Sequence, residues 1–406
     1  MPKFPPCSAC GLPFSSQFIQ LAGHVRHGAE IPTYLCPRCS HGTTATPDQS
    51  APNRVTAAYR TRVYGDHEHA ALLEDDRGQF AEPDVEQEAL VRRRRVQDVV
   101  QALALVPRDR PHRIMHVGCR EGRLLEQLST QIAATTIGLE PWTPWCDEAR
   151  RRGVHAEAVT AEDVAPFADP DERLDLIVEH HLLEHLDQPR AHLRRLHRLL
   201  ADDGVLIIEV PNLLRAYGRL ETRFLQEHHR QVFTSRSLAT ACMRAGFSPL
   251  HIDRGANLRI FCQKSHDPSE RSQVFHGANA DDVFQAVWSN EARLTVKQAL
   301  AKTGATDAVL ELVASTHARC RWAPGRADIA LEAAVALERA DRYGEAATWL
   351  RESLLDRHDG EVAAMLRRIE WIERSRRGPR RRRVVTLPLA PAGAPPRLPA
   401  LAAMIN

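Results

Sequence analysis

The sequence predicts an α/β fold with an open sheet and helices on both of its faces. Short apolar runs alternate with helical segments from residue 113 onward, and the strand candidates are RIMHV, TIGLE, LDLIVEH, VLIIEV, SPLHI and LRIFCQK. Between two of them, PRAHLRRLHRLLADDG is typical of a helix, because proline often opens a helix and Gly204 is a common residue at a helix end. A glycine-containing turn, GCREG, joins the first strand candidate to the helical segment after it.

The composition is typical of a globular protein. The chain has 406 residues, enough for two or three domains, and 43% of them are apolar. No stretch approaches the roughly 20 apolar residues that a membrane helix requires. The first residues, MPKFPPCSAC, lack the apolar core of a signal peptide. We therefore expect a cytoplasmic protein with no membrane partner.

The charge is distributed unevenly along the chain. Residues 374–406 contain eight arginines and no acid. Since the whole chain has a net charge of +2, the residues before this tail have a net charge of about −6. A domain that binds nucleic acid usually presents a basic surface instead. We therefore expect no nucleic-acid partner, and we expect the Arg/Pro-rich residues 373–406 to be disordered.

Four of the nine cysteines form two CxxC pairs, Cys7 with Cys10 and Cys36 with Cys39. Each CxxC aims two thiolates at one point, and two such pairs complete a tetrahedral site for Zn²⁺. A segment this short buries little core, so metal binding would supply much of its folding free energy. We therefore expect residues 1–45 to form a zinc module with a closed, structural site. A redox dithiol and chance CxxC pairs in a disordered leader are the alternatives.

Three further regions are expected between this module and the C-terminal tail. Residues 46–89 form a linker and leading helices, one of them AAYRTRVYGDHEHAALLEDD, and residues 90–265 form the α/β domain. Residues 266–372 are helical, with two helical stretches around DRYGEA that resemble one tetratricopeptide unit; a helical cap on the sheet domain is the alternative. This helical region is a candidate docking site for a protein partner.

The turn HVGCREGRLL suits a nucleotide-binding fold but excludes two kinds of it. A dinucleotide-binding turn would have the pattern GxGxxG, and a phosphate-binding P-loop would end in GK[ST]. Neither pattern is present. The next strand candidate ends in Glu140, 18 residues after Gly122. An acid at that place can accept both hydroxyls of an adenosine ribose.

Taken together, these motifs resemble class I S-adenosylmethionine-dependent methyltransferases of the small-molecule type. HVGCREGRLL, IGLEPW, AEDV, LDLIVEHHLLEHLDQPRAHLRRLHRLLADDGVLIIEVPN and HHRQVFTSRSLATACMRAGF occur in the order of that family, over about residues 90–264. With the four-cysteine segment in front, the chain is similar to deoxysugar C-methyltransferases. The resemblance implies a Rossmann-like sheet. It also implies methyl transfer from S-adenosylmethionine to a small-molecule acceptor, such as a nucleotide sugar or a natural-product intermediate.

The resemblance also implies which residues bind the cofactor. They are Gly118, Cys119, Arg120, Gly122, Glu140, Glu162, Asp163 and His180. The first four would pass under the methionine part of the cofactor, and the glutamate after them would bind the ribose. The next two would flank the adenine, and the histidine would lie near the sulfonium.

The acceptor would face the loop EHHLLEH, and its candidate catalytic residues are His181, Glu184 and His185. An imidazole titrates near neutral pH, so a histidine in this loop could take a proton from the acceptor. Further histidines that would lie on the acceptor side are His228 and His229.

Two residues depart from the family pattern. His116 stands where relatives have an acid that binds the ammonium group of the cofactor. Without that acid, the binding free energy of the cofactor would be weaker by on the order of 1–3 kcal/mol. Arg120 stands where they have glycine, which suits a positive φ or a close backbone approach. A degenerate, non-catalytic scaffold that binds protein partners is therefore one alternative function. An RNA methyltransferase is another, although the acidic body and the lack of an [ND]PP[YF] motif argue against it.

Overall fold

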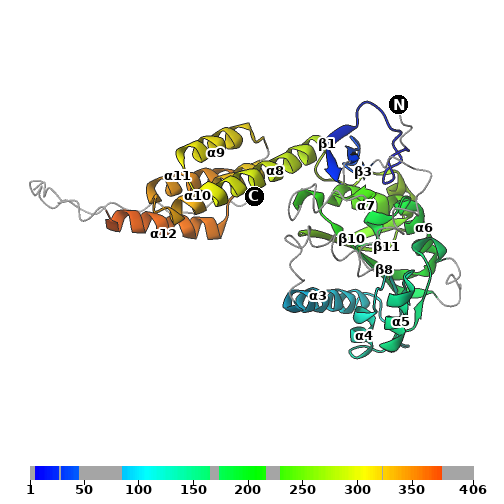
Figure 1. Cartoon of the computed structure of the whole chain (residues 1–406). Helices are drawn as coiled ribbons and strands as arrows, with labels where there is room; N and C mark the ends of the chain where they lie inside the picture. Colours follow the sequence, from blue (N-terminus) through cyan, green and yellow to red (C-terminus); the bar gives the residue numbers. More distant parts are fainter. Residues whose placement is uncertain are drawn as a thin grey trace, which may run out of the picture.

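The computed structural model describes residues 5–26, 29–44, 85–164, 173–215, 229–321 and 323–376 (Figure 1). The expected helix at residues 57–76, His228 and the tail beyond residue 376 lie outside the described residues.

The centre of the molecule is a seven-stranded sheet with the order β10-β11-β8-β7-β4-β5-β6. Five neighbouring strands run parallel, and β11 and β10 are added antiparallel at one edge. The strands are β4 (His112–Val117), β5 (Ala134–Leu139), β6 (Ala156–Glu157), β7 (Leu174–His180), β8 (Leu200–Pro211), β10 (Phe247–Arg254) and β11 (Asn257–Lys264). The predicted α/β fold is confirmed, and all six strand candidates are strands.

Helices cover both faces of this sheet and enclose a separate apolar core on each side. One core contains α3 (Val85–Leu103), α4 (Arg123–Ser129) and α5 (Thr143–Arg151), and the other contains α6 (Pro189–Leu199) and α7 (Ser235–Ala245). Side chains of β7 alternate between the two cores, as the period of a strand requires: Leu176 and Val178 face one, and Ile177 faces the other.

Helix α6 is shorter than the sequence predicts. It ends at Leu199, and the residues up to Gly204, expected to complete the helix, already belong to β8. Leu200 pairs with Leu174 of β7 and is fully buried, so sheet pairing prevails over the helical pattern at this point.

The N-terminal residues form a second, antiparallel sheet with the order β1-β2-β3-β9. Its strands are β1 (Ile19–Arg26), β2 (Ala29–Leu35), β3 (Gly42–Thr44) and β9 (Gln231–Val232). Because β9 comes from the middle of the chain, the pairing of Gly42 with Val232 joins the cysteine-containing segment to the larger sheet domain.

A buried polar cluster reinforces this junction. The Oε1 of Gln231 accepts a hydrogen bond from Ser8 Oγ at 2.7 Å and lies 2.8 Å from Nε2 of His41. Burial lowers the pKa of His41 to about 4, so this imidazole is neutral at pH 7. The amide nitrogen of Gln231 donates to the carbonyl of Leu186 at 2.9 Å. One side chain thus connects the N-terminal segment to the loop after β7.

The C-terminal residues form five helices that extend away from the sheets (Figure 1). They are α8 (Ala280–Thr303), α9 (Asp307–Arg319), α10 (Ala323–Arg339), α11 (Tyr343–Asp356) and α12 (Gly360–Arg376). The first turns of α8 pack on the N-terminal sheet through Val283 and Val287. The small residues Ala346 and Ala347 of α11 are buried against α10 and α12.

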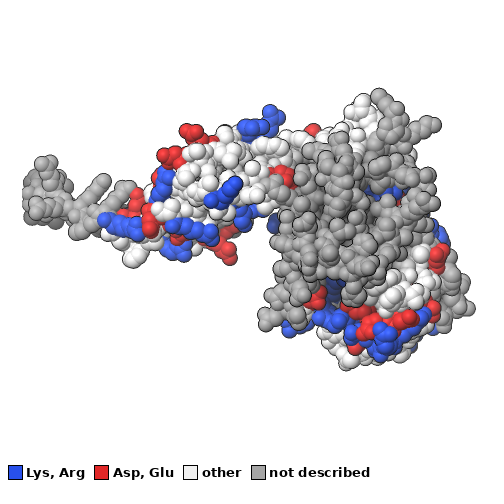
Figure 2. All heavy atoms as spheres, in the orientation of Figure 1, with Lys and Arg blue, Asp and Glu red and all other residues white. Residues whose placement is uncertain are grey.

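The second of the two predicted helical stretches is divided into α11 and α12. Asp359 accepts hydrogen bonds from the backbone N–H groups of Glu361 and Val362, at 2.9 and 3.2 Å, and so caps the start of α12. Basic and acidic side chains are interspersed over these helices (Figure 2). Several pair between helices, as Arg368 does with Glu338. Within the described ranges, the helices lack the combination of length and apolar character needed to cross a membrane.

Replacing Gln231 should destabilise the whole sheet domain. We expect Gln231→Ala to lower the free energy of unfolding by about 1–3 kcal/mol, because it removes the partner of the Leu186 carbonyl and one of the two partners of His41 Nε2 in a buried site. Urea unfolding measures this change. The control Gln263→Ala removes an exposed hydrogen bond and should cost less than about 1 kcal/mol. Equal stability of the two variants would contradict the role given to Gln231.

Candidate active site

The turn after β4 is built from residues with positive φ. Gly118, Arg120 and Gly122 have φ values of 74°, 51° and 76°. A Cβ atom at Gly122 would lie 2.9 Å from the Cβ of Ala149 in α5, so this glycine permits the close approach of the turn to that helix. Arg120 adopts the left-handed conformation although it is not glycine, and its guanidinium lies 4.5 Å from the ring centre of Trp145. This stacking accommodates the bulky side chain.

Glu140 lies at the end of β5 and joins that end to the turn. Its two carboxylate oxygens accept hydrogen bonds from the backbone N–H groups of Arg120 and Trp142, both at 3.0 Å. The side chain is buried and fixed by these bonds. An ionised carboxylate only accepts hydrogen bonds, so donors such as ligand hydroxyls are its chemical counterparts.

The residues expected at the adenine follow the edge strand β6. Both belong to the short 3-10 helix η2 (Ala161–Asp163). Asp163 is exposed and accepts a hydrogen bond from Thr160 Oγ1 at 2.7 Å, while the side chain of Glu162 is outside the description.

His116 and His180 meet at the carboxyl ends of β4 and β7. His116 Nε2 lies 3.3 Å from His180 Nδ1. Burial, together with the positive charge of Arg95, lowers the pKa of His116 to about 3 and holds the pKa of His180 well below its usual value. Both rings are therefore neutral at pH 7. His116 Nδ1 is buried and has no hydrogen-bond partner among the described residues.

His181 is held between two buried carboxylates. Its Nδ1 lies 3.1 Å from Glu184 Oε1, and its Nε2 lies 3.2 Å from Glu209 Oε1. Burial disfavours the imidazolium, but the hydrogen bonds to both glutamates outweigh it and raise the pKa of His181 to about 9. At pH 7 this ring is a cation that donates two hydrogen bonds. It cannot accept a proton from an acceptor in that state.

Glu209 takes part in a wider network. It accepts hydrogen bonds from Arg95 of α3 at 2.6 Å and from Asn257 of β11 at 3.3 Å. Although burial opposes ionisation, His181 and Arg95 hold the pKa of Glu209 well below its usual range. Glu209 was not among the site residues predicted from the sequence. A charged residue inside the buried strand VLIIEV was the signal that could have identified it.

Glu184 and His185 form the end of the 3-10 helix η5 (Leu183–His185), with His229 beside them. Glu184 is 2% exposed, and its Oε2 has no hydrogen-bond partner among the described residues. His185 Nε2 lies 3.9 Å from Glu184 Oε1, and the centres of the His185 and His229 rings are 5.0 Å apart. The three predicted catalytic residues are thus neighbours, and His229 joins them from a distant part of the chain.

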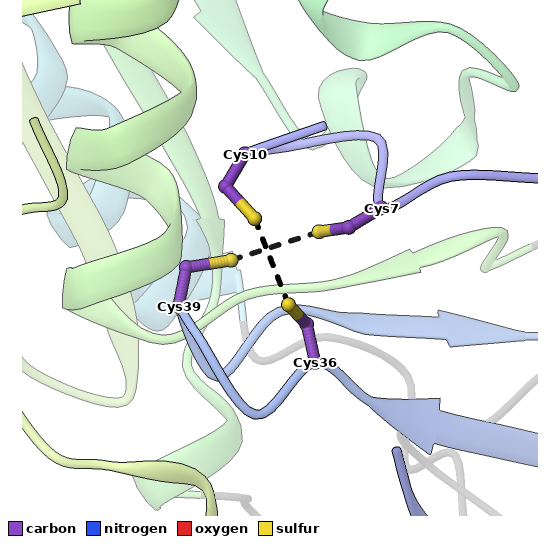
Figure 3. A group of neighbouring side chains, drawn as sticks. All are labelled: Cys7, Cys10, Cys36 and Cys39. Carbon is purple, nitrogen blue, oxygen red and sulfur yellow. Dashed lines mark hydrogen bonds between the residues drawn. The ribbon is translucent and has the colours of Figure 1, made fainter. Parts of the chain in front are cut away.

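The four N-terminal cysteines converge on one point (Figure 3). Cys7 Sγ lies 3.6 Å from Cys39 Sγ, and Cys10 Sγ lies 3.6 Å from Cys36 Sγ. All four are buried, and none forms a disulfide. Tetrahedral ligands about 2.3 Å from a zinc ion would be about 3.8 Å apart. The donor set and its spacing fit Zn²⁺.

Residues 89–252 match a family model described as "Methyltransferase domain". Over 233 residues the chain is 26% identical to a Mycobacterium tuberculosis protein described as "Probable S-adenosylmethionine-dependent methyltransferase", covering 56% of this chain and 78% of that protein. It is 32% identical over 152 residues to trans-aconitate 2-methyltransferase of Methylobacterium nodulans, covering 37% of this chain and 57% of that enzyme. A solved Burkholderia thailandensis 1,6-didemethyltoxoflavin-N1-methyltransferase aligns with a TM-score of 0.39 and 19% identity, over 60% of this chain and 100% of that one.

The sheet and the matched residues define a class I methyltransferase domain. The protein is an S-adenosylmethionine-dependent methyltransferase.

The buried neutral His116 should make the protein less stable in mild acid. Its pKa is about 3 in the folded state and about 6.5 in the unfolded chain, so below pH 6.5 the unfolded state takes up a proton that the folded state does not. Stability is therefore lost as the pH falls from about 6.5 toward 3. Between pH 7 and 5.5 we expect wild type to lose about 1 kcal/mol more unfolding free energy than His116→Gln. Urea unfolding at the two pH values measures this difference, and identical losses would contradict it.

Proposed function

We propose that the protein transfers a methyl group from S-adenosylmethionine to a small molecule, such as a nucleotide sugar or a natural-product intermediate, bound beside His181, Glu184 and His185. The observation that carries the proposal is the fixed carboxylate of Glu140 at the edge of a left-handed glycine turn. The buried polar loop after β7, at the same edge of the sheet, supports the position of the acceptor. A relative named for trans-aconitate, a small molecule, is consistent with this acceptor class.

The residues of the turn fit the cofactor. Gly118 leaves the space in front of Leu182 free of a side chain, and we assign the carboxylate of Glu140, at the end of β5, to the two ribose hydroxyls. We assign the backbone of Gly118, Cys119, Arg120 and Gly122 to the methionine part of the cofactor. Glu162 and Asp163 are assigned to the adenine, and His180 to the sulfonium. When bound, the cofactor supplies an electrophilic methyl group.

His116 takes the place of the acid that the family pattern would have. Because its ring is neutral at pH 7, it can offer a buried nitrogen lone pair to an ammonium group, but no negative charge. A hydrogen bond to a charged group contributes about 1.5–3 kcal/mol, so the ammonium can still be bound without a carboxylate.

The three residues on the acceptor side have different roles in this proposal. His181 is an imidazolium that fixes Glu184 from one side. Glu184 and the partly exposed His185 engage the nucleophilic atom of the acceptor. His181 is therefore a positioning residue in this proposal, and the proton of the nucleophile is not transferred to it.

We further propose that Cys7, Cys10, Cys36 and Cys39 hold one structural Zn²⁺. The support is the tetrahedral spacing and burial of the four sulfur atoms. Since the four cysteines lie in the same apolar core as Leu182 and Leu186, the ion would stabilise the loop that carries the acceptor residues.

Glu140 provides the direct test of the cofactor site. We expect Glu140→Ala to weaken binding of S-adenosylmethionine by about 10- to 150-fold, because a charge-assisted pair of hydrogen bonds contributes roughly 1.5–3 kcal/mol. Arg120→Gly should leave binding unchanged or tighten it, since glycine adopts the positive φ at no cost. Calorimetry on the full chain measures both. The exposed Glu157→Ala is the matched control and should bind as wild type does.

Two results would contradict this proposal. Full affinity in Glu140→Ala would place the ribose elsewhere. A wild-type chain that does not bind the cofactor would favour a non-catalytic scaffold.

The zinc assignment is tested by metal content. Cys7→Ala combined with Cys36→Ala should lose one equivalent of zinc per chain, because two of the four ligands are removed. Elemental analysis of the purified proteins measures the difference. Cys320→Ala, a buried cysteine of the helical region, is the control and should keep the wild-type content. Unchanged zinc in the double variant would overturn the assignment.

A further inference from the structure

Glu184, His185 and His229 place one carboxylate oxygen and two imidazole nitrogens within 4.8 Å of one another. This group lies apart from the four cysteines and comes from two segments, the 3-10 helix η5 and the residue two positions before β9. Two histidines and a carboxylate are a ligand set typical of divalent first-row transition metals with open coordination positions.

The separation of His185 from Glu184 suits a shared ion better than a direct hydrogen bond. His185 Nε2 and Glu184 Oε1 are 3.9 Å apart, beyond hydrogen-bond length. Two ligand atoms that are each about 2.1 Å from one ion are about 3–4.2 Å apart for angles between 90° and 180°. The separation of 3.9 Å falls in this range, although it is measured to Oε1, which His181 also contacts, and not to Oε2 of the same carboxylate.

The state of Glu184 is an independent observation. The side chain is 2% exposed, yet its Oε2 has no hydrogen-bond partner among the described residues. Leaving a buried carboxylate oxygen unsatisfied is costly, and a cation is one group that removes this cost. His181 balances the charge only at the other oxygen and is itself shared with Glu209.

We propose that Glu184, His185 and His229 bind a divalent transition-metal ion whose open positions receive an oxygen atom of the acceptor. This proposal rests on the proposed methyl transfer and specifies its acceptor as an oxygen-bearing molecule. Glu184 and His185 then engage the acceptor through the ion. A cation with three protein ligands can bind two adjacent oxygens of a diol or a hydroxy acid and orient one of them.

The test is a titration with Co²⁺ of the full chain carrying its zinc. We expect about one equivalent of Co²⁺ to bind, with the absorption spectrum of nitrogen and oxygen ligands and without the intense charge-transfer band of a cobalt thiolate. Catechol, a small chelating diol, should then change this spectrum. Absence of binding, a thiolate spectrum, or a spectrum that catechol leaves unchanged would overturn the proposal.

Substitutions of the proposed ligand residues test which side chains bind the ion. Glu184→Gln and His185→Ala should each weaken Co²⁺ binding at least 10-fold, and the partly exposed His185 ensures a test if the buried Glu184→Gln fails to fold. The exposed His155→Ala should bind Co²⁺ as wild type does. Wild-type affinity in His185→Ala would overturn the assignment.

Binding of S-adenosylhomocysteine, measured by calorimetry on the same samples, separates this proposal from the one it rests on. If S-adenosylhomocysteine binds to the protein but Co²⁺ does not, the metal site alone is overturned. If Co²⁺ binds but S-adenosylhomocysteine does not, the proposed methyl transfer is overturned and the metal site is retained.

Discussion

The parallel pairing of β4 with β7 is the constraint on which the site depends. The chain runs outward from β4 to β5 and β6, then returns to place β7 on the opposite side of β4. The loops that leave β4 and β7 therefore diverge at the carboxyl ends of these strands, which is where open α/β sheets bind their ligands. His116 and His180 lie at this point, with Glu140 at the neighbouring strand end. The predicted cofactor residues from Gly118 to Asp163 follow parallel strands of this sheet, and His180 is the last residue of β7.

Charge balance explains why so many ionisable groups can be buried there. Two cations, Arg95 and the His181 imidazolium, lie beside two carboxylates, Glu184 and Glu209. Buried ions are tolerated when they are paired and hydrogen-bonded, but such networks rarely improve stability over apolar packing. The network is therefore more readily explained by function than by folding. Arg95 has a second effect, because its charge helps to keep His116 and His180 neutral.

The fold could be read from the sequence because its strands are apolar runs bounded by turns, and the parallel sheet follows from their alternation with helices. Glu140 could be predicted because it directly follows β5, and Glu184 because it lies in the motif that follows β7. Glu209 had a local signal only as a charged residue inside a buried strand, and His229 was indicated only by the family resemblance. Arg95 reaches the site through a hydrogen bond between distant segments, which a local pattern does not record. The end of α6 was misjudged for the same reason, since the pairing of Leu200 with Leu174 decides it.

The N-terminal segment shapes the acceptor side rather than standing apart from it. Strand β3 pairs with β9, and Thr44 donates a backbone hydrogen bond to the carbonyl of Arg230 at 3.1 Å. Arg230 in turn donates to Asp187 at 2.6 Å, at the end of the loop that carries Glu184. His229 directly precedes these residues, so its position opposite Glu184 depends on the pairing of β3 with β9. A change in the four-cysteine cluster would therefore reach His229 through the pairing of β3 with β9 and the acceptor loop through the shared apolar core.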